Sequence, residues 1–394
     1  MKSLALLILL SGTVTACGQT TPPAPAPAKP AAGSPATPTA PAAEVRYIAE
    51  DVVTGVRVPW AIAFDPSGRM LFTERAGRVR VYENGKLQPE AYFTVANVLV
   101  ASETGLMGMC LHPDYKTNKL VYLAYGYKAG GEQDVRVVRF KDTGTTLEQD
   151  KVIVSGIGVS GNHSGTQIDF GPDGKLYIST GEMFEQHRAQ DLGDLGGKFL
   201  RVNDDGSVPN DNPFVGKEGA RGEIWTLGNR NPQGFDWQPG TNELFSTEHG
   251  PSGEVKDGSR RAGGGDEFNH IQKGKNYGWP TIFYDQKKEG LESPLVVWRS
   301  PTMAPGGGCF YDGDKFPQLK GNYLAACLLG RQIRRITLDG SKVVSDETFV
   351  KDYGRIRAIV IGPDGFIYFS TSNRDGRGKP ADSDDRIVRL KPQS

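Results

Sequence analysis

His163 is the side chain of this sequence whose type and setting best suit acid–base chemistry. It stands in the stretch SGNHSGTQIDFGPDG, where flanking glycines leave room for its ring. An imidazole takes up a proton near neutral pH, so a histidine at the mouth of a loop is a candidate general base. The alternative is a structural histidine, and the other histidines of the chain have weaker settings.

Three arginines indicate a planar, anionic ligand. Arg230 and Asn231 stand together in the turn GNRNPQGF, which is rich in hydrogen-bond donors. Arg355 and Arg357 lie two residues apart in YGRIRAIVIGPDG, so a strand would point both to one side. Adjacent guanidinium groups repel unless an anion lies between them, and their planar forks pair well with carboxylates. A solvated strand end is the alternative for this pair.

A third group of residues offers hard oxygen ligands. Gly250 and Pro251 form a constrained turn in EHGPSG, and Asp266 and Glu267 follow three glycines in GGGDEFN. Carboxylate and main-chain oxygens are the ligands that Ca²⁺ selects. An ordinary polar turn has the same composition, and no spacing of Cys and His residues supports zinc.

These residues stand next to a phrase that recurs six times, a Pro/Asp/Gly turn followed by a short alternating strand. The copies begin near residues 64, 111, 170, 237, 310 and 361, and the fifth is looser than the others. Six similar units predict an all-β fold, a six-bladed β-propeller of four-stranded antiparallel blades. A β-sandwich with coincidental turns is the alternative, and no GxGxxG motif follows a strand as a Rossmann fold would need.

The ends and the long connections of this ring can also be predicted. Strand-like segments at 45–52 and 386–392 are placed to close the ring within one blade. Long connections of a propeller gather on one face, and function tends to lie there. The long connections are 155–166, 182–214, 228–235, 249–280 and 300–308.

Residues 1–17 have the pattern of a lipoprotein signal peptide. A charged start and a short apolar run precede Val14-Thr15-Ala16-Cys17, which resembles a bacterial lipobox. Cleavage before Cys17 would leave it carrying lipid, so we expect an extracytoplasmic, membrane-tethered lipoprotein at the periplasmic face or cell envelope. An ordinary secretory signal is the alternative. Residues 18–43 are a Pro/Ala-rich linker and residues 44–394 form the propeller domain.

Composition excludes one class of partner. Lys and Arg number 46 and Asp and Glu number 46, so the formal net charge is zero. Nucleic-acid binding requires a basic surface, so no nucleic-acid partner is expected. Cys110 lies among apolar residues of the predicted core, whereas Cys309 and Cys327 could form a disulfide or remain two buried thiols.

The ordered motifs resemble one family. VPWAIAFDP, GLMGMCLHPDY, NHSG, GNRNPQGF, KGKNYGWP, PTMAP and GRIRAIVIGPDGFIYFST occur in order over residues 58–371. Together they resemble the soluble PQQ-dependent glucose and aldose sugar dehydrogenases, the glucose/sorbosone dehydrogenase family of six-bladed propellers. The resemblance implies oxidation of C1 of a cyclic aldose to the lactone, with transfer of hydride to pyrroloquinoline quinone (PQQ) and then of electrons to an external acceptor.

The resemblance also implies roles for residues of this sequence. It identifies His163 as the general base, supported by Asp266. It places on the quinone and its carboxylates the residues Arg230, Asn231, Thr302, Arg355 and Arg357. Main-chain oxygens of Gly250 and Pro251 would bind the Ca²⁺ that the quinone also contacts, and Glu267 and Tyr277 would hold a further calcium.

Two positions depart from the family pattern. Glu103 stands where the family commonly has a glutamine that touches the quinone, which sets an anion near an anionic cofactor. Leu329 stands where a lysine is usual, and Arg331 is a candidate for the missing cation. These departures favour one alternative, a propeller that binds sugar or a partner without turnover. A propeller lactonase is a further alternative, which would need a more acidic metal site than one histidine and main-chain carbonyls provide.

Overall fold

The computed structural model of the protein describes residues 44–251, 264–299 and 301–393. Residues 44–394 cluster as one compact unit. The predicted signal peptide, its Cys17 and the linker at 18–43 lie outside the described residues. No helix in the described part of the chain is both long and apolar enough to cross a bilayer.

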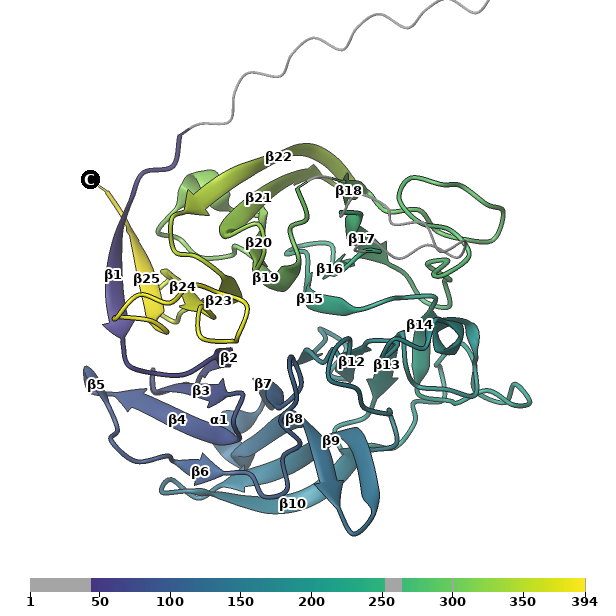
Figure 1. Ribbon diagram of the computed structural model, residues 1–394, viewed down its shortest axis with the longest axis horizontal. Helices are drawn as coiled ribbons and strands as arrows, with labels where there is room; N and C mark the ends of the chain where they lie inside the picture. Colours follow the sequence, from purple (N-terminus) through teal and green to yellow (C-terminus); the bar gives the residue numbers. More distant parts are fainter. Residues whose placement is uncertain (1–43, 252–263, 300, 394) are drawn as a thin grey trace, which may run out of the picture. The chain divides into compact units, whose positions relative to one another are not determined.

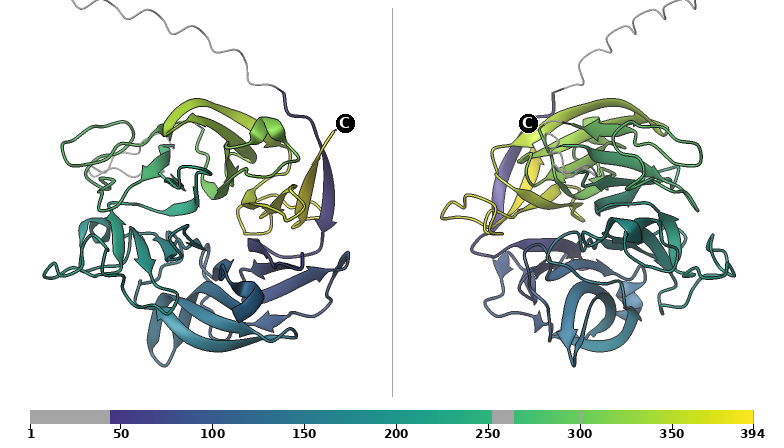
Figure 2. Two further views of the ribbon diagram at one scale, coloured as in Figure 1. Left: turned by 180° about the vertical axis from the view of Figure 1, so that it is seen from behind. Right: turned by 45° about the vertical axis from the view of Figure 1, so that its right-hand side comes forward.

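Six antiparallel sheets are arranged in a ring, which confirms the predicted six-bladed propeller (Figures 1 and 2). The first blade contains β2 (Pro59–Phe64), β3 (Met70–Glu74), β4 (Arg78–Glu83) and β5 (Lys86–Leu87). The second contains β7 (Leu106–Leu111), β8 (Leu120–Ala129), β9 (Glu132–Asp142) and β10 (Leu147–Val154). The third contains β11 (Ile168–Phe170), β12 (Leu176–Thr180), β13 (Lys198–Val202) and β14 (Ile224–Leu227). A short β6 (Phe93–Thr94) adds a fifth strand to the first blade by pairing with β4.

The other three blades follow the same order. The fourth blade contains β15 (Pro232–Trp237), β16 (Leu244–Glu248), β17 (Asp266–Ile271) and β18 (Val296–Trp298). The fifth contains β19 (Pro305–Phe310), β20 (Tyr323–Cys327), β21 (Gln332–Asp339) and β22 (Lys342–Lys351). The sixth contains β23 (Ile356–Ile361), β24 (Ile367–Thr371), β25 (Ile387–Pro392) and β1 (Tyr47–Val53). The described helices are short: α1 (Tyr115–Asn118) and the 3-10 turns η1 (Gln186–Gln190) and η2 (Pro317–Leu319).

The first and last strands of the domain close the ring. β1 pairs antiparallel with β25, with Tyr47 opposite Pro392 and Ala49 opposite Leu390. The chain ends are therefore joined in one blade, as the sequence predicted. Closure of this kind protects sheet edges that would otherwise be open.

The second strand of each recurring unit is buried because neighbouring blades cover both of its faces. Every residue of β3, β12, β16, β20 and β24 is buried, and the sequences are rich in apolar, β-branched and aromatic residues. Aromatic rings fill the space between blades: Phe245 of β16 meets Phe310 of β19 edge-on with centroids 5.6 Å apart, and the ring of Phe268 in β17 lies 4.9 Å from that of Tyr323 in β20.

Cys309 and Cys327 are free thiols, as is Cys110 in the core. Cys309 lies opposite Leu324 across the β19–β20 pair, whereas Cys327 lies three residues further along β20. Residues an odd number apart on a strand point to opposite faces, so the two sulfur atoms are on different sides of the sheet. This arrangement excludes the disulfide that the sequence had left open.

Candidate active site

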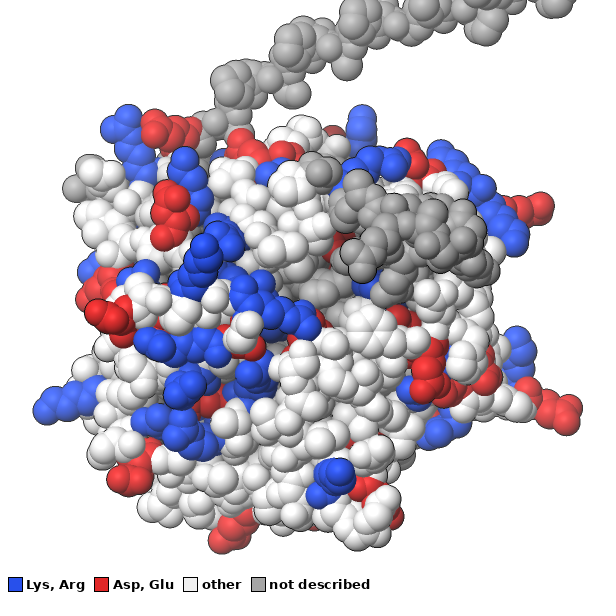
Figure 3. All heavy atoms as spheres, in the orientation of Figure 1, with Lys and Arg blue, Asp and Glu red and all other residues white. Residues whose placement is uncertain are grey.

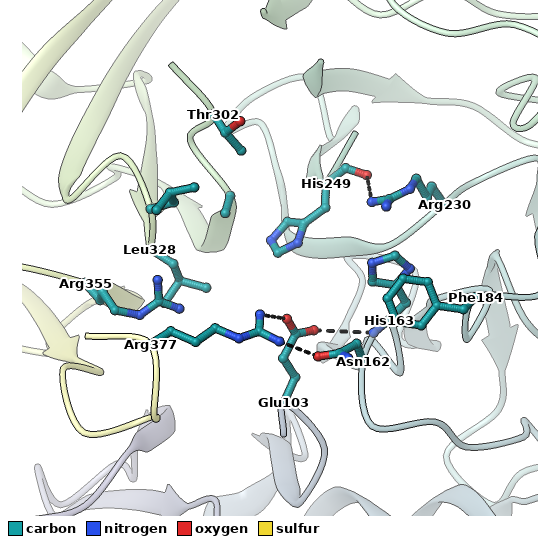
Figure 4. Close-up of a pocket in the computed structure, with 12 residues that line it drawn as sticks. Glu103, Asn162, His163, Phe184, Arg230, His249, Thr302, Leu328, Arg355 and Arg377 are labelled. Carbon is teal, nitrogen blue, oxygen red and sulfur yellow. Dashed lines mark hydrogen bonds and ion pairs between the residues drawn. The ribbon is translucent and has the colours of Figure 1, made fainter. Parts of the chain in front are cut away.

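Loops from every blade meet around one cavity of about 340 Å³ (Figure 4). All the connections that contribute leave the same end of the sheets, so residues far apart in sequence converge there. Five of the predicted site residues line this cavity: Glu103, His163, Arg230, Thr302 and Arg355. The face drawn in Figure 3 carries a group of Lys and Arg side chains where Figure 1 places β2, β3 and β23.

His163 faces the cavity and is held by a buried carboxylate. Its Nδ1 lies 3.0 and 3.1 Å from the two oxygens of Glu182, whose side chain has no exposed surface. The carboxylate fixes the hydrogen on Nδ1, which leaves the Nε2 lone pair free to accept a proton. His163 adopts a left-handed backbone with φ of 54°, a conformation of higher energy that occurs often at functional sites.

The expected support of His163 by Asp266 is wrong. The Asp266 carboxylate instead accepts hydrogen bonds from the main-chain N–H groups of Gly250, Met303 and Ala304, at 2.7–3.0 Å. Asp266 begins β17, beside the end of β16, so it is placed to tie together the loops that follow β16 and β18. Its role in the structure is to shape those loops.

Sequence reasoning missed Glu182, although the repeat contained a signal for it. In three of the copies the buried second strand ends in an acidic residue or is followed by one within two residues: FTE with Glu74, STGE with Glu182 and STE with Glu248. All three carboxylates are buried. A buried acid at this recurring position is placed to bind a group on a neighbouring loop, as Glu182 binds His163.

The side chains of the three predicted arginines are all buried. Arg355 forms an ion pair with Asp375 at 2.8 Å, and Arg230 donates to the main-chain oxygen of His249 at 3.1 Å. Arg357 lies deeper: it donates to Gln233 at 3.4 Å and its guanidinium carbon is 5.3 Å from the centre of the Trp60 ring. Burial lowers the pKa of Arg357 to about 10, although Glu103 opposes this effect.

Asn231 and Arg331 do not lie among the described residues that line the cavity. Asn231 is buried, accepts from Gln233 at 3.2 Å and lies 3.4 Å from Nδ1 of His249. Arg331 is an exposed residue at the β20–β21 turn, with φ of 53°. Leu329 lines the cavity and is 52% exposed. Because Arg331 does not line the cavity, it does not supply the cation that was expected on this side of the site.

His249 is a second histidine of the cavity that the sequence did not single out. Its Nε2 lies 2.7 Å from the main-chain oxygen of Pro305, so Nε2 carries the hydrogen and donates it. Burial lowers the pKa of His249 to about 4, against the opposing effect of Asp266. His249 is therefore neutral near pH 7 and acts as a fixed donor.

The four predicted metal residues, Gly250, Pro251, Glu267 and Tyr277, line one small cavity of about 10 Å³. Glu248 lines it too and lies directly opposite Glu267 across the β16–β17 pair. Burial raises the pKa of both carboxyls, and for Glu267 the neighbouring Glu248 adds to the effect.

This small cavity fits a dication, because an ion of opposite charge would favour the ionised form of the two buried carboxyls. Within the described ranges no group of three or more His, Cys, Asp or Glu side chains is placed to hold a metal ion. A calcium ion there would thus need main-chain oxygens as well.

Comparison with known proteins identifies the family of this chain. The model of the family described as Glucose / Sorbosone dehydrogenase matches residues 56–383. Aldose sugar dehydrogenase YliI of Escherichia coli K12 is 35% identical over 343 residues, which cover 81% of this chain and 88% of that protein.

Solved structures are similar over the whole propeller. A structure from Thermus thermophilus has 41% identity and a TM-score of 0.80, and covers 87% of this chain and 99% of its own. The PQQ-bound form of aldose sugar dehydrogenase from Streptomyces coelicolor has 30% identity, a TM-score of 0.76 and coverage of 89% and 99%. The chain therefore belongs to the glucose/sorbosone dehydrogenase family of oxidoreductases.

Proposed function

We propose that this protein is a PQQ- and Ca²⁺-dependent aldose sugar dehydrogenase that oxidises C1 of a cyclic aldose to the lactone. One observation carries the proposal: the His163–Glu182 pair faces a 340 Å³ cavity that also holds the Arg230 and Arg355 side chains. A proton acceptor and two anion-binding groups thus face one space.

The donor set of the cavity fits PQQ, a flat tricarboxylate. Arg230, Arg355 and Thr302 line the walls and can donate hydrogen bonds to carboxylates and carbonyls. Arg357 lies close behind them, and its Nε is buried without a hydrogen-bond partner among the described residues. A buried cation with unmet bonding capacity is stabilised by an anion, so it favours a carboxylate ligand over a neutral sugar alone.

His163 would act as the base on the C1 hydroxyl. Because Nδ1 donates to Glu182, Nε2 is the atom that accepts the hydroxyl proton, and the Glu182 anion stabilises the imidazolium that results. Bound PQQ would supply the two-electron acceptor for the hydride that leaves C1. The arginines would orient the ring of that cofactor beside His163.

Ca²⁺ would be held near this cavity by main-chain oxygens of Gly250 and Pro251, with Glu267 and Tyr277 serving a further ion. The small cavity shares Arg230 and His249 with the large one, so an ion there would lie next to the ligand pocket. A dication at this place would polarise a ligand carbonyl and favour negative charge on its oxygen.

A reconstitution assay tests the proposal. Purified apoprotein is mixed with PQQ and Ca²⁺, then given glucose or another aldose and an artificial electron acceptor. Acceptor reduction that requires both additions is the expected result. Sugar binding without reduction would indicate a non-catalytic propeller, and lactone hydrolysis without PQQ a lactonase.

We further propose that the protein acts as a lipoprotein, tethered at Cys17 to an extracytoplasmic membrane face and passing electrons to an external acceptor there. The lipobox-like sequence and the Pro/Ala-rich segment after it support this location. Globomycin, an inhibitor of lipoprotein signal peptidase, should cause the unprocessed chain to accumulate. Unchanged processing, together with a Cys17→Ser chain that stays in the membrane fraction, would contradict the lipid anchor.

A further inference from the structure

Arg377 lies at the mouth of the 340 Å³ cavity and joins three loops. Its guanidinium forms an ion pair with Glu103. Its Nη2 also donates to Ser102 Oγ at 3.0 Å and to Asn162 Oδ1 at 2.5 Å. Figure 4 shows the side chain reaching from the β24–β25 loop toward Glu103 and Asn162. The side chain is 48% exposed, so it borders the opening of the cavity.

Glu103 is the acidic side chain among the described residues that line this cavity. Burial acts to raise the pKa of Glu103, but His249 in its protonated form, Arg377 and Arg357 outweigh this effect, and the pKa is lowered to about 2. The carboxylate is therefore ionised at neutral pH. An uncompensated anion at this position would repel a polyanionic ligand.

We propose that Arg377 sets the charge of the cavity: by pairing with Glu103 it cancels a negative charge that would offset the attraction of Arg230 and Arg355 for a planar polyanion such as PQQ. This inference rests on the proposed function and assigns a role to Arg377, a residue that the family pattern did not indicate. Leu329 gives no cation on its side of the cavity and Arg331 lies outside it, so Arg377 is the exposed cation at the mouth among the described lining residues.

A purely structural role would have a different signature. Glu103 also accepts from the main-chain N–H of His163 at 3.3 Å, so the ion pair could merely fix that loop. In that case Arg377→Gln, Glu103→Gln and the double variant would all weaken the ligand to a similar extent, because each of them breaks the ion pair. If Arg377 acts by neutralising Glu103, removal of the Glu103 charge restores the affinity that is lost with Arg377.

A double-mutant cycle on the apoprotein distinguishes the two roles. We would measure Kd for PQQ in the presence of Ca²⁺ by quenching of intrinsic fluorescence, for wild type, Arg377→Gln, Glu103→Gln and the double variant. Glutamine at 103 keeps an oxygen for the His163 N–H, and glutamine at 377 keeps hydrogen-bonding capacity without charge. Arg374→Gln is the matched control, because Arg374 bonds the main-chain oxygens of Asp384 and Ala381.

The expected result is a Kd at least roughly ten-fold weaker for Arg377→Gln, as for loss of one charge compensation near a ligand. The double variant should bind within about three-fold of wild type, Glu103→Gln should bind at least as tightly as wild type, and Arg377→Lys should recover most of the affinity. Weakening in Glu103→Gln or in the double variant as large as in Arg377→Gln, or no weakening in Arg377→Gln, would overturn the inference alone. Failure of wild type to bind PQQ would overturn the proposed function and this inference with it.

Discussion

Glu182 binds His163 Nδ1 with both carboxylate oxygens, at 3.0 and 3.1 Å, from the end of a fully buried strand. This contact connects the buried strands of the blade to the candidate catalytic histidine. β12 is covered on both faces, so the residues that follow it are held in place. Glu182 is one of these residues, and its hydrogen bonds fix the position of His163 in its loop. Its N–H also donates to the main-chain oxygen of Arg230 at 2.9 Å, which ties the base to the anion-binding loop.

Glu182→Gln should lower kcat strongly while leaving PQQ affinity nearly unchanged. The amide keeps the shape of the side chain but removes the charge that stabilises the imidazolium, and it can select the wrong tautomer of His163. We expect a loss on the order of 10²-fold or more in kcat. Steady-state kinetics with the reconstituted enzyme, beside a fluorescence titration of PQQ, make the measurement. A wild-type kcat in this variant would remove Glu182 from the mechanism.

His163→Ala should retain bound PQQ but lose turnover by a factor on the order of 10² or more, the usual size of a general-base effect. The neighbouring His249 provides a matched control, because it donates Nε2–H to Pro305 and has no free Nε2 lone pair. His249→Gln should therefore affect kcat less than His163→Ala. The reverse order would assign the base to His249.

Binding of calcium at this site should raise the thermal stability of the apoprotein. Opposed, buried Glu248 and Glu267 carry raised pKa values, so a bound dication relieves an unfavourable pair. We expect Ca²⁺ to raise the Tm of the apoprotein, and Glu267→Gln to reduce that increase. Glu243→Gln is the control, because the Glu243 side chain is 40% exposed and lies near His270. An equal Ca²⁺ effect in all three proteins would place the ion elsewhere.

Arg357→Met should weaken binding of the cofactor while changing the stability of the apoprotein little. The guanidinium is buried with an unbonded Nε, so the apoprotein tolerates an apolar side chain of similar volume at little cost or even with a gain. Binding of an anionic cofactor should instead weaken by roughly 1.5–3 kcal/mol, the value of a charge-assisted hydrogen bond. Thermal unfolding of the apoprotein and a PQQ titration test both parts. Unchanged PQQ affinity would remove Arg357 from the cofactor site.

The fold could be predicted because its signal repeats. Six turn-and-strand phrases gave the blades, and the two end segments gave the closing pair of β1 with β25. Residues placed by this repeat, such as His163 just before β11 and Arg355 just before β23, could be assigned to one face. Their position immediately before a repeated strand was enough for these predictions.

Partners that come from loops of different blades could not be predicted in the same way. The His163–Glu182 pair spans 19 residues and the Glu103–Arg377 pair 274, and neither has a periodic signal that links its two members. Asp266 and Glu182 are both acids beside the end of a strand, so composition did not separate them. Their hydrogen-bond partners in the folded ring separate them, because Glu182 bonds the histidine whereas Asp266 bonds main-chain N–H groups.

The charge of Glu103 should be visible in acid unfolding. Its folded-state pKa of about 2 lies below the ordinary value of 4.5, so between these pH values the unfolded chain binds more protons than the folded one. Its contribution to stability is therefore complete above about pH 4.5 and is lost as pH falls toward 2. A pKa difference of this size corresponds to roughly 3 kcal/mol at most. Urea unfolding of wild type and Glu103→Gln at about pH 6, 4 and 3 should show the difference in unfolding free energy shrinking on acidification, since the amide does not titrate. A constant difference would mean that Glu103 gains no net stabilisation from Arg377 and its neighbours, and that the ion pair at the mouth is formed at no advantage to the folded state.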